Sequence, residues 1–118
     1  MNAGCLKLAV ILKETDECIG FCNTCVKEEL PIPHREIAYA ISTVHRNNGY
    51  ITKAVKGLTA FLFTQTNADT LQIVAVERNV GSNRVSIKSG FSYIGNVAID
   101  GEPHRHYVLR KEEWEKTQ

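Results

Sequence analysis

A loop between a predicted strand and a predicted helix has the residue types of an anion-binding site. The strand ends at residues 41–43, and residues 44–50 (VHRNNGY) lead directly into the helix. Gly49 lets backbone N–H groups approach a ligand closely, and a helix N-terminus carries partial positive charge. The loop therefore suits a phosphate group, although a single glycine at a helix start is also typical of a turn that binds nothing.

Three cysteines, Cys18-x-x-x-Cys22-x-x-Cys25, have the spacing of the radical SAM motif, in which thiolates hold a four-iron cluster. On a regular strand, Cys18 and Cys22 would lie on one face and Cys25 on the other, so the thiols diverge. The chain is also too short for the barrel that follows this motif in those enzymes. We expect buried thiols that pack as small apolar groups, and a thiol-ligated metal or iron–sulfur site is the alternative.

Four histidines provide the other candidate metal ligands. His104 and His106 would share one face of a strand, whereas His34 and His45 lie elsewhere in the chain. Because no third ligand follows at a clear spacing, we expect no metal site here.

Hydrophobic patterning predicts a mixed α/β domain with the order β-β-β-α-β-α-β-β. The first strand alternates with apolar residues on both faces, which predicts a strand covered on both sides. Proline-rich residues 27–33 are predicted as a loop, and residues 100–103 as a turn. The predicted strands are Leu6–Leu12, Cys18–Cys25, Ile37–Ile41, Leu71–Val76, Phe91–Ile99 and His106–Leu109, and the predicted helices are Tyr50–Gln65 and a second that starts near Asn79–Ser82 and ends at Gly90.

Length and composition narrow the class of protein. A chain of 118 residues with 43% hydrophobic and 23% charged residues predicts one globular domain, residues 1–118. Fourteen Lys and Arg against thirteen Asp and Glu leave no basic excess, so we expect no nucleic-acid partner. No apolar run has the length of a membrane span, and the N-terminus lacks the pattern of a signal peptide. We therefore expect no membrane partner, a cytoplasmic location and four reduced cysteines.

Three segments of the chain, residues 46–54, 79–91 and 107–114, together resemble the GNAT acetyltransferases. The resemblance is to the branch that contains the N-terminal acetyltransferases of ribosomal proteins in particular. Residues 46–54 (RNNGYITKA) resemble the family's Arg/Gln-x-x-Gly-x-Gly/Ala segment. Residues 79–91 (NVGSNRVSIKSGF) are similar to its Asn-x-x-Ser…Lys-x-Gly-Phe signature, and residues 107–114 (YVLRKEEW) to its closing Tyr…Leu…Glu-Trp. The resemblance covers Leu6 to Trp114. It implies a truncated GNAT-like acyl-CoA N-acyltransferase fold, with a mixed, mainly antiparallel sheet and two helices.

The resemblance implies an acetyl-CoA site. The loop that ends at Ile51 would wrap the pyrophosphate through its backbone amides, in agreement with the local physics. The strand end would pair with the pantetheine arm and polarise the thioester carbonyl, and two residues of the second signature would contact the cofactor further along. The cofactor-binding residues implied in this way are Ile41, Ser42, Thr43, Arg46, Asn47, Asn48, Gly49, Tyr50, Ile51, Asn79 and Ser82.

Two residues are candidates for proton transfer. Ser86 stands where many GNAT enzymes have a tyrosine that protonates the departing thiolate, and a serine there is also an ordinary helix residue. Glu36 matches an acidic position that is frequent in this branch, where it would take the proton of the amine through water. A solvated strand end is the other interpretation of Glu36.

The resemblance implies acetyl transfer from acetyl-CoA to a primary amine, either a protein N-terminus or a small molecule, by direct attack in a ternary complex. It begins at the family's second strand, so the first strand and the two helices that form one wall of the acceptor site have no counterpart. Either a partner subunit or a swapped segment would replace that wall, or the site would be unusually open, or activity would be lost. A degenerate acyl-CoA-binding module is thus one alternative. An unpaired edge strand near the N-terminus would favour a homodimer.

Overall fold

The computed structural model describes residues 5–26 and 35–118, and the loop predicted over residues 27–33 and His34 lie outside them. The structure is a mixed α/β fold, as expected. Its elements are β1 (Leu6–Leu12), β2 (Glu17–Val26), β3 (Arg35–Ile41), a 3-10 turn (Thr43–His45), α1 (Tyr50–Gln65), β4 (Thr70–Val76), α2 (Val80–Lys88), β5 (Ser92–Ile99), β6 (Glu102–Arg110) and α3 (Lys111–Lys116).

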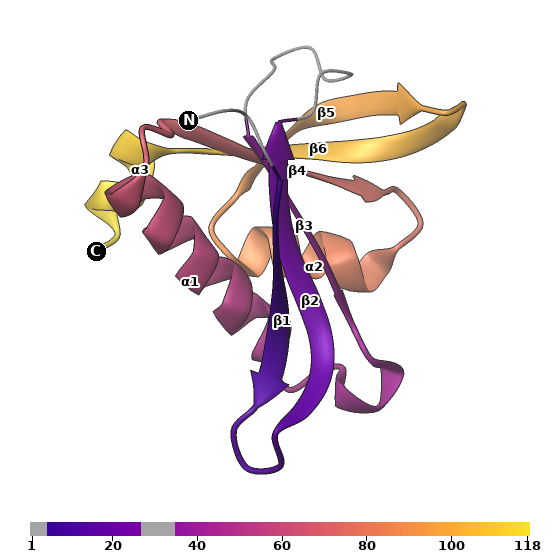
Figure 1. The fold of residues 1–118 in the computed structure, drawn as a ribbon. Helices are drawn as coiled ribbons and strands as arrows, with labels where there is room; N and C mark the ends of the chain where they lie inside the picture. The colour runs from indigo at the N-terminus through magenta and orange to yellow at the C-terminus, as the bar shows by residue number, and fades with distance from the viewer. Residues whose placement is uncertain (1–4, 27–34) are drawn as a thin grey trace.

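The strands form one sheet in the order β1-β2-β3-β4-β6-β5. All neighbours pair antiparallel except β3 and β4, which pair parallel through Arg35 with Leu71 and Glu36 with Gln72. A parallel pair needs a long crossover connection, which α1 supplies. Beyond these two residue pairs β3 and β4 separate, and the two halves of the sheet diverge (Figure 1).

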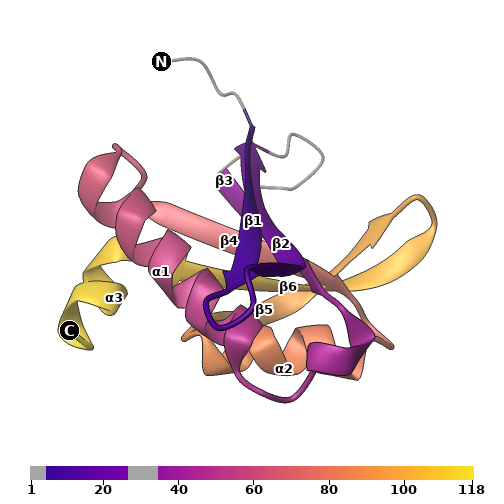
Figure 2. The same cartoon turned by 60° about the horizontal axis from the view of Figure 1, so that its bottom comes forward.

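The hydrophobic core lies between one face of the sheet and the two longer helices (Figures 1 and 2). Helix α1 buries an apolar stripe that includes Ile51, Val55 and Leu62, as its helical period predicts. These side chains pack against the alternate residues of the strands, such as Ile37 on β3 and Leu71 on β4. The helix bounds predicted from this period are confirmed.

Helix α2 is held against the sheet by the side-chain amide of Asn83. Its Nδ2 donates to the carbonyl oxygens of Val76, Glu77 and Asn79 at 3.1, 3.2 and 2.8 Å. Its Oδ1 accepts a hydrogen bond of 2.8 Å from the hydroxyl of Tyr107, which is fully buried on β6. One buried amide therefore joins the end of β4, the start of α2 and β6.

The prediction that the first strand is covered on both faces is wrong. β1 lies at the edge of the sheet, and Leu6, Leu8 and Ile11 remain 41%, 41% and 48% exposed. The alternation shows that both faces of the strand are apolar, but it does not show whether another layer packs on each face. Within the part of the chain that the structure describes, no helix is long and apolar enough to cross a bilayer.

The cysteines differ from expectation in two ways. A bulge leaves Ile19 without a partner on β1, because Val10 pairs with Gly20 and Ile11 with Cys18. The bulge reverses the alternation, so Cys18 is exposed and Cys22 is buried in the core instead of both lying on one face. Burial raises the pKa of the Cys22 thiol to about 11, which keeps it protonated.

Cys25 forms a disulfide with Cys5, so the expectation of four reduced cysteines is wrong for this pair. The register pairs Leu6 with Thr24, which places the two cysteines opposite each other with their Cα atoms 4.4 Å apart. The structure gives the alternative of a thiol-ligated cluster no support, because Cys25 is bonded to Cys5, Cys18 is exposed and Cys22 lies in the core. No group of three side chains suited to a metal occurs in residues 5–26 and 35–118.

The C-terminal part contains a third helix and a tighter turn than predicted. The β5–β6 turn is the pair Asp100 and Gly101, both with positive φ, so Pro103 lies inside β6. Helix α3 was not predicted, because its six residues are mostly charged and too few to show an apolar period. Its Trp114 packs against Phe63 of α1, with ring centroids 5.4 Å apart.

Replacement of Gly20 by Ala should lower the free energy of unfolding by about 2 to 3 kcal/mol. A Cβ atom at this position would lie 2.3 Å from the backbone oxygen of Ala40, across the β2–β3 pair. The control is Gly57→Ala in α1, where an added Cβ meets nothing within 4 Å. This substitution should raise the free energy of unfolding by about 0.5 to 1 kcal/mol, because alanine favours the helix over glycine. Urea unfolding followed by circular dichroism measures both, and an equally stable Gly20→Ala variant would contradict the pairing.

Asn83→Ala should lower the free energy of unfolding by about 3 kcal/mol, because it removes the donor to three carbonyl groups and the acceptor of a buried hydroxyl. Asn79→Ala is the comparison. It removes one capping bond and should cost about 1 kcal/mol. Equal losses in the two variants would show that Asn83 does not connect these elements.

Candidate functional site

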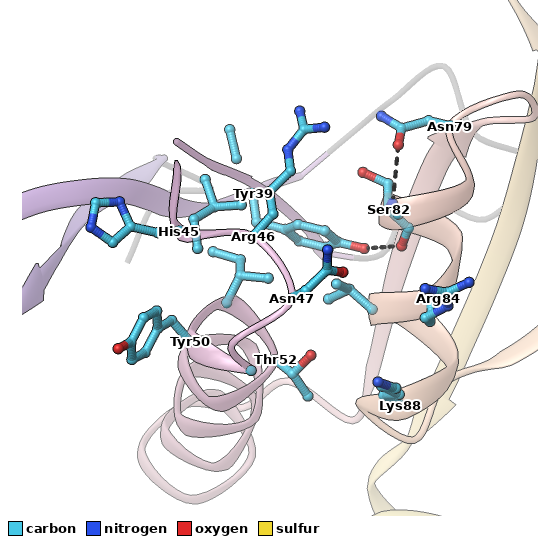
Figure 3. Close-up of a pocket in the computed structure, with 16 residues that line it drawn as sticks. Tyr39, His45, Arg46, Asn47, Tyr50, Thr52, Asn79, Ser82, Arg84 and Lys88 are labelled. Atoms are coloured by element: carbon cyan, nitrogen blue, oxygen red, sulfur yellow. Dashed lines mark hydrogen bonds between the residues drawn. The ribbon is translucent and has the colours of Figure 1, made fainter. Parts of the chain in front are cut away.

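A cavity of about 390 Å³ lies between the end of β3, the loop that follows it, the first turn of α1 and one face of α2 (Figure 3). It lies on the side where β3 has separated from β4, with Tyr39 and Ile41 of β3 in its lining. The predicted anion-binding loop therefore forms part of a real cavity, and α2 supplies the opposite side.

The loop has the backbone conformation that its sequence favours. Asn47 and Gly49 have φ values of 65° and 77°, in the left-handed region that Asn and Gly adopt most readily. The side chain of Asn48 donates to the carbonyl oxygens of His45 and Arg46 at 3.3 and 3.2 Å. Gly49 is the N-cap of α1, so the N-terminus of this helix opens on the cavity.

Side chains connect the same loop to the β1–β2 hairpin. The hydroxyl of Ser42 lies 2.8 Å from Nδ1 of His45, and Nε2 of His45 lies 3.5 Å from the carboxylate of Glu17. The backbone N–H of Ser42 also donates to the carbonyl oxygen of Ile19 at 2.7 Å. The end of β3 and the cavity loop are therefore fixed to an element far away in the sequence.

The face of α2 that lines the cavity follows from where the helix begins. Asn79 caps the helix by accepting a hydrogen bond of 3.1 Å from the backbone N–H of Ser82. Residues 81, 84, 85 and 88 then follow one another at helical spacing along the cavity. This face carries the cations Arg84 and Lys88 (Figure 3).

The cavity has a positive electrostatic character. Arg46 lines it from the loop, and Arg84 and Lys88 from α2, whereas none of the described residues in the lining is acidic. The positive end of the α1 dipole has the same sign. Together these groups suit an elongated anion, with phosphates near the loop and α2.

Tyr39 connects β3 to α2 at the side of the cavity. Its hydroxyl donates a hydrogen bond of 2.7 Å to the carbonyl oxygen of Ser82 (Figure 3) and lies 2.9 Å from Oγ of Ser86. Burial raises the pKa of Tyr39 to about 12, and the hydrogen bond with Ser86 acts in the opposite direction.

Most of the cofactor-binding residues predicted from the sequence line this cavity. They are Ile41, Arg46, Asn47, Gly49, Tyr50, Ile51, Asn79 and Ser82. Ser42, Thr43 and Asn48 were also predicted but do not line the cavity. Ser42 and Thr43 directly follow Ile41 in the sequence, and Asn48 stabilises the loop through its hydrogen bonds to His45 and Arg46. The side chain of Ile51 is 6% exposed and packs in the core beneath the loop.

The two predicted proton-transfer residues lie outside the lining. Ser86 is fully buried, and its hydroxyl contacts Tyr39 and the carbonyl oxygen of Ser82. Glu36 belongs to the last residue pair that joins β3 to β4. Strand alternation places its side chain on the face opposite to Ile37 and Tyr39.

Sequence reasoning missed several lining residues, among them Tyr39, His45, Arg84 and Lys88. The helical period of α2, counted from the Asn79 cap, could have indicated Arg84 and Lys88. Tyr39 follows Ile37 by two residues on the apolar face of its strand, where an aromatic residue is first interpreted as core.

Comparisons with known proteins agree with this fold. A curated relative from Bacillus subtilis (strain 168) is named Probable N-acetyltransferase YjcK. Its sequence is 32% identical to this chain over 77 residues, which cover 62% of this chain and 42% of that protein. The chain therefore spans less than half the length of this curated relative.

Solved structures share the fold at low sequence identity. Aminoglycoside acetyltransferase AAC(6')-Ib, solved in complex with coenzyme A, is 23% identical with a TM-score of 0.85, and the match covers 98% of this chain and 71% of that one. Ribosomal-protein-S5-alanine acetyltransferase from Vibrio fischeri is 20% identical with a TM-score of 0.74, over 88% of this chain and 60% of that one. The family profile described as acetyltransferase (GNAT) domain matches residues 1–92, and the chain therefore belongs to the GNAT acetyltransferase family.

Proposed function

We propose that this chain binds acetyl-CoA in the cavity beside β3 and transfers the acetyl group to a primary amine by direct attack in a ternary complex. The observation that carries the proposal is the cationic cavity where β3 leaves β4, with the N-terminus of α1 at one side and Arg84 and Lys88 at the other. Family membership supports it, and so does the coenzyme A bound to AAC(6')-Ib, a protein of the same fold.

The proposed binding mode follows the charges of the site. The loop ending in Gly49 and the first turn of α1 would hold the pyrophosphate through backbone N–H groups, with Arg46 beside it. The pantetheine arm would lie along the end of β3, where the separation from β4 leaves backbone groups of residues 41–43 without a neighbouring strand on that side. Asn79 and Ser82 of α2 would contact the cofactor from the opposite side.

The chemical step requires an uncharged amine. Its nitrogen attacks the carbonyl carbon of the thioester, the C–S bond breaks, and the amine loses one proton while the sulfur gains one. Glu36 lies where the two strands separate, and strand alternation places its side chain on the face opposite to Tyr39. We propose that the amine approaches from that face and that Glu36 receives its proton through water.

The class of amine is also a proposal. AAC(6')-Ib has been solved with kanamycin, and the Vibrio fischeri protein is named for an alanine of ribosomal protein S5. The aminoglycoside kanamycin and a peptide with an N-terminal alanine are therefore the first acceptors to test.

Two further predictions concern the whole protein. The homodimer has structural support, because β1 lies at the sheet edge with exposed Leu6 and Leu8. Sedimentation analysis would measure the oligomeric state.

The cytoplasmic location stays a prediction. The Cys5–Cys25 disulfide is an observation against it, because disulfides are rare in cytosolic proteins.

Gly49→Asp should abolish acetyl-CoA binding, because it places a negative charge and a side chain at the positive end of α1. The matched control is Gly101→Asp. Gly101 has a φ of 78°, close to the 77° of Gly49, and no neighbour within 4 Å of an added Cβ, but it lies in the β5–β6 turn outside the cavity lining. Both variants place an aspartate at nearly the same positive φ, so calorimetric titration with acetyl-CoA separates the effect on the site from the effect of that backbone conformation.

Release of free thiol from acetyl-CoA, measured with kanamycin and with an alanine-initiated peptide, tests transfer. Amine-dependent release supports the enzyme. Binding heat without thiol release would instead support an acyl-CoA-binding module without catalysis. The site assignment is wrong if the wild-type chain gives no heat with acetyl-CoA or if Gly49→Asp binds normally.

A further inference from the structure

Tyr39 of β3 lines the cavity and carries a phenolic hydroxyl, at a position that does not match the usual family tyrosine on α2. Position 86 of α2 holds a serine, which is fully buried and does not line the cavity. The phenol of Tyr39 reaches that serine from β3, with 2.9 Å between the two oxygens. The strand thus brings a phenolic hydroxyl close to a helix position that lacks one.

In the proposed binding mode, Tyr39 lies along β3 at the level of the thioester of acetyl-CoA. The cavity lining includes Tyr39, Ala40 and Ile41 on this strand, and the strands meet again at Glu36. An arm that starts at the pyrophosphate loop and follows β3 must therefore end near Tyr39, because pairing with β4 closes the gap beyond. This step rests on the proposed function.

The surroundings keep this hydroxyl protonated and in place. Burial is the main cause of the raised pKa of Tyr39, and the hydrogen bond with Ser86 lowers this pKa in part. The negative charges that Tyr107 on β6 and Cys22 on β2 acquire when they ionise raise it further. Arg46, Arg84 and Lys88 are the charged side chains in the cavity lining. A phenol that stays protonated at neutral pH can supply a proton to a developing thiolate.

We propose that Tyr39 protonates the sulfur of coenzyme A as the C–S bond breaks. The hydroxyl hydrogen of Tyr39, which the free chain donates to the carbonyl oxygen of Ser82, turns toward the sulfur. The bond between the amine nitrogen and the acetyl carbon forms, the C–S electron pair moves to sulfur, and sulfur takes the hydroxyl proton of Tyr39. Ser86 turns its hydroxyl hydrogen toward the tyrosinate oxygen and stabilises it. The ammonium of the intermediate loses its extra proton through water to Glu36. Glu36 then releases this proton to solvent, and solvent returns a proton to Tyr39, so the enzyme is regenerated. Tyr39 is then a catalytic residue, and Ser86 a positioning residue.

Tyr39→Phe should lower kcat by about 100-fold, with little change in the affinity for acetyl-CoA. The ring keeps its packing, and the carbonyl oxygen of Ser82 keeps a donor because Ser86 Oγ lies 3.1 Å from it. Thiol release with kanamycin or the alanine-initiated peptide gives kcat, and calorimetry with acetyl-CoA checks binding. Ser86→Ala should give a smaller loss, because the phenol remains.

The pH profile separates catalysis from a structural role. Incorporation of 3,5-difluorotyrosine in place of Tyr39 lowers the pKa of the phenol and should move the alkaline fall of kcat to lower pH. The same residue in place of Tyr93, which is exposed on β5 outside the cavity lining, should leave the profile unchanged. An unshifted profile at position 39 contradicts the proposal.

Other outcomes are equally informative. A loss in Ser86→Ala or Ser82→Ala larger than that in Tyr39→Phe would overturn the proposal and assign the proton to a serine hydroxyl. Unchanged kcat in Tyr39→Phe, with an active wild-type chain, would overturn this inference alone. A wild-type chain that releases no thiol with either amine would overturn the proposed transfer together with it.

Discussion

The separation of β3 from β4 is the constraint on which the rest of the structure depends. Two residue pairs join these parallel strands, and the strands then diverge, so the sheet loses its hydrogen bonding where the cavity lies. The α1 crossover fills the core beneath this opening and directs its N-terminus toward it. Because α2 is fixed to β4 and β6 by Asn83, the opening keeps two walls that belong to different halves of the sheet.

The parts of the fold that local signals determine could be predicted from the sequence. The apolar period of α1 is long and regular, and the bounds predicted from it are the observed ones. The Asn79 cap and the sharp change of pattern at Gly49 marked both helix starts that contribute to the cavity. Most of the cavity residues that the sequence analysis named could be predicted for the same reason, since they lie within a few residues of these two signals.

Features that depend on distant pairing could not be predicted. The edge position of β1, the bulge at Ile19 and the approach of Cys5 to Cys25 all follow from strand register, which no local pattern reveals. The contact between Tyr39 and Ser86 joins residues 47 positions apart. Each of the two residues has an ordinary local explanation, a core aromatic and a helix serine, and only the tertiary structure shows that their hydroxyl groups meet.

The contacts of His45 have a consequence for the thermodynamics of binding. A loop that must become ordered around a ligand loses conformational entropy when it binds, and this loss weakens affinity. Here Ser42 and Glu17 contact the imidazole from two sides, and Asn48 closes the turn from within. The hairpin thus holds the loop in one conformation, so the start of β2 would contribute to the affinity proposed for acetyl-CoA although Glu17 lies outside the cavity lining.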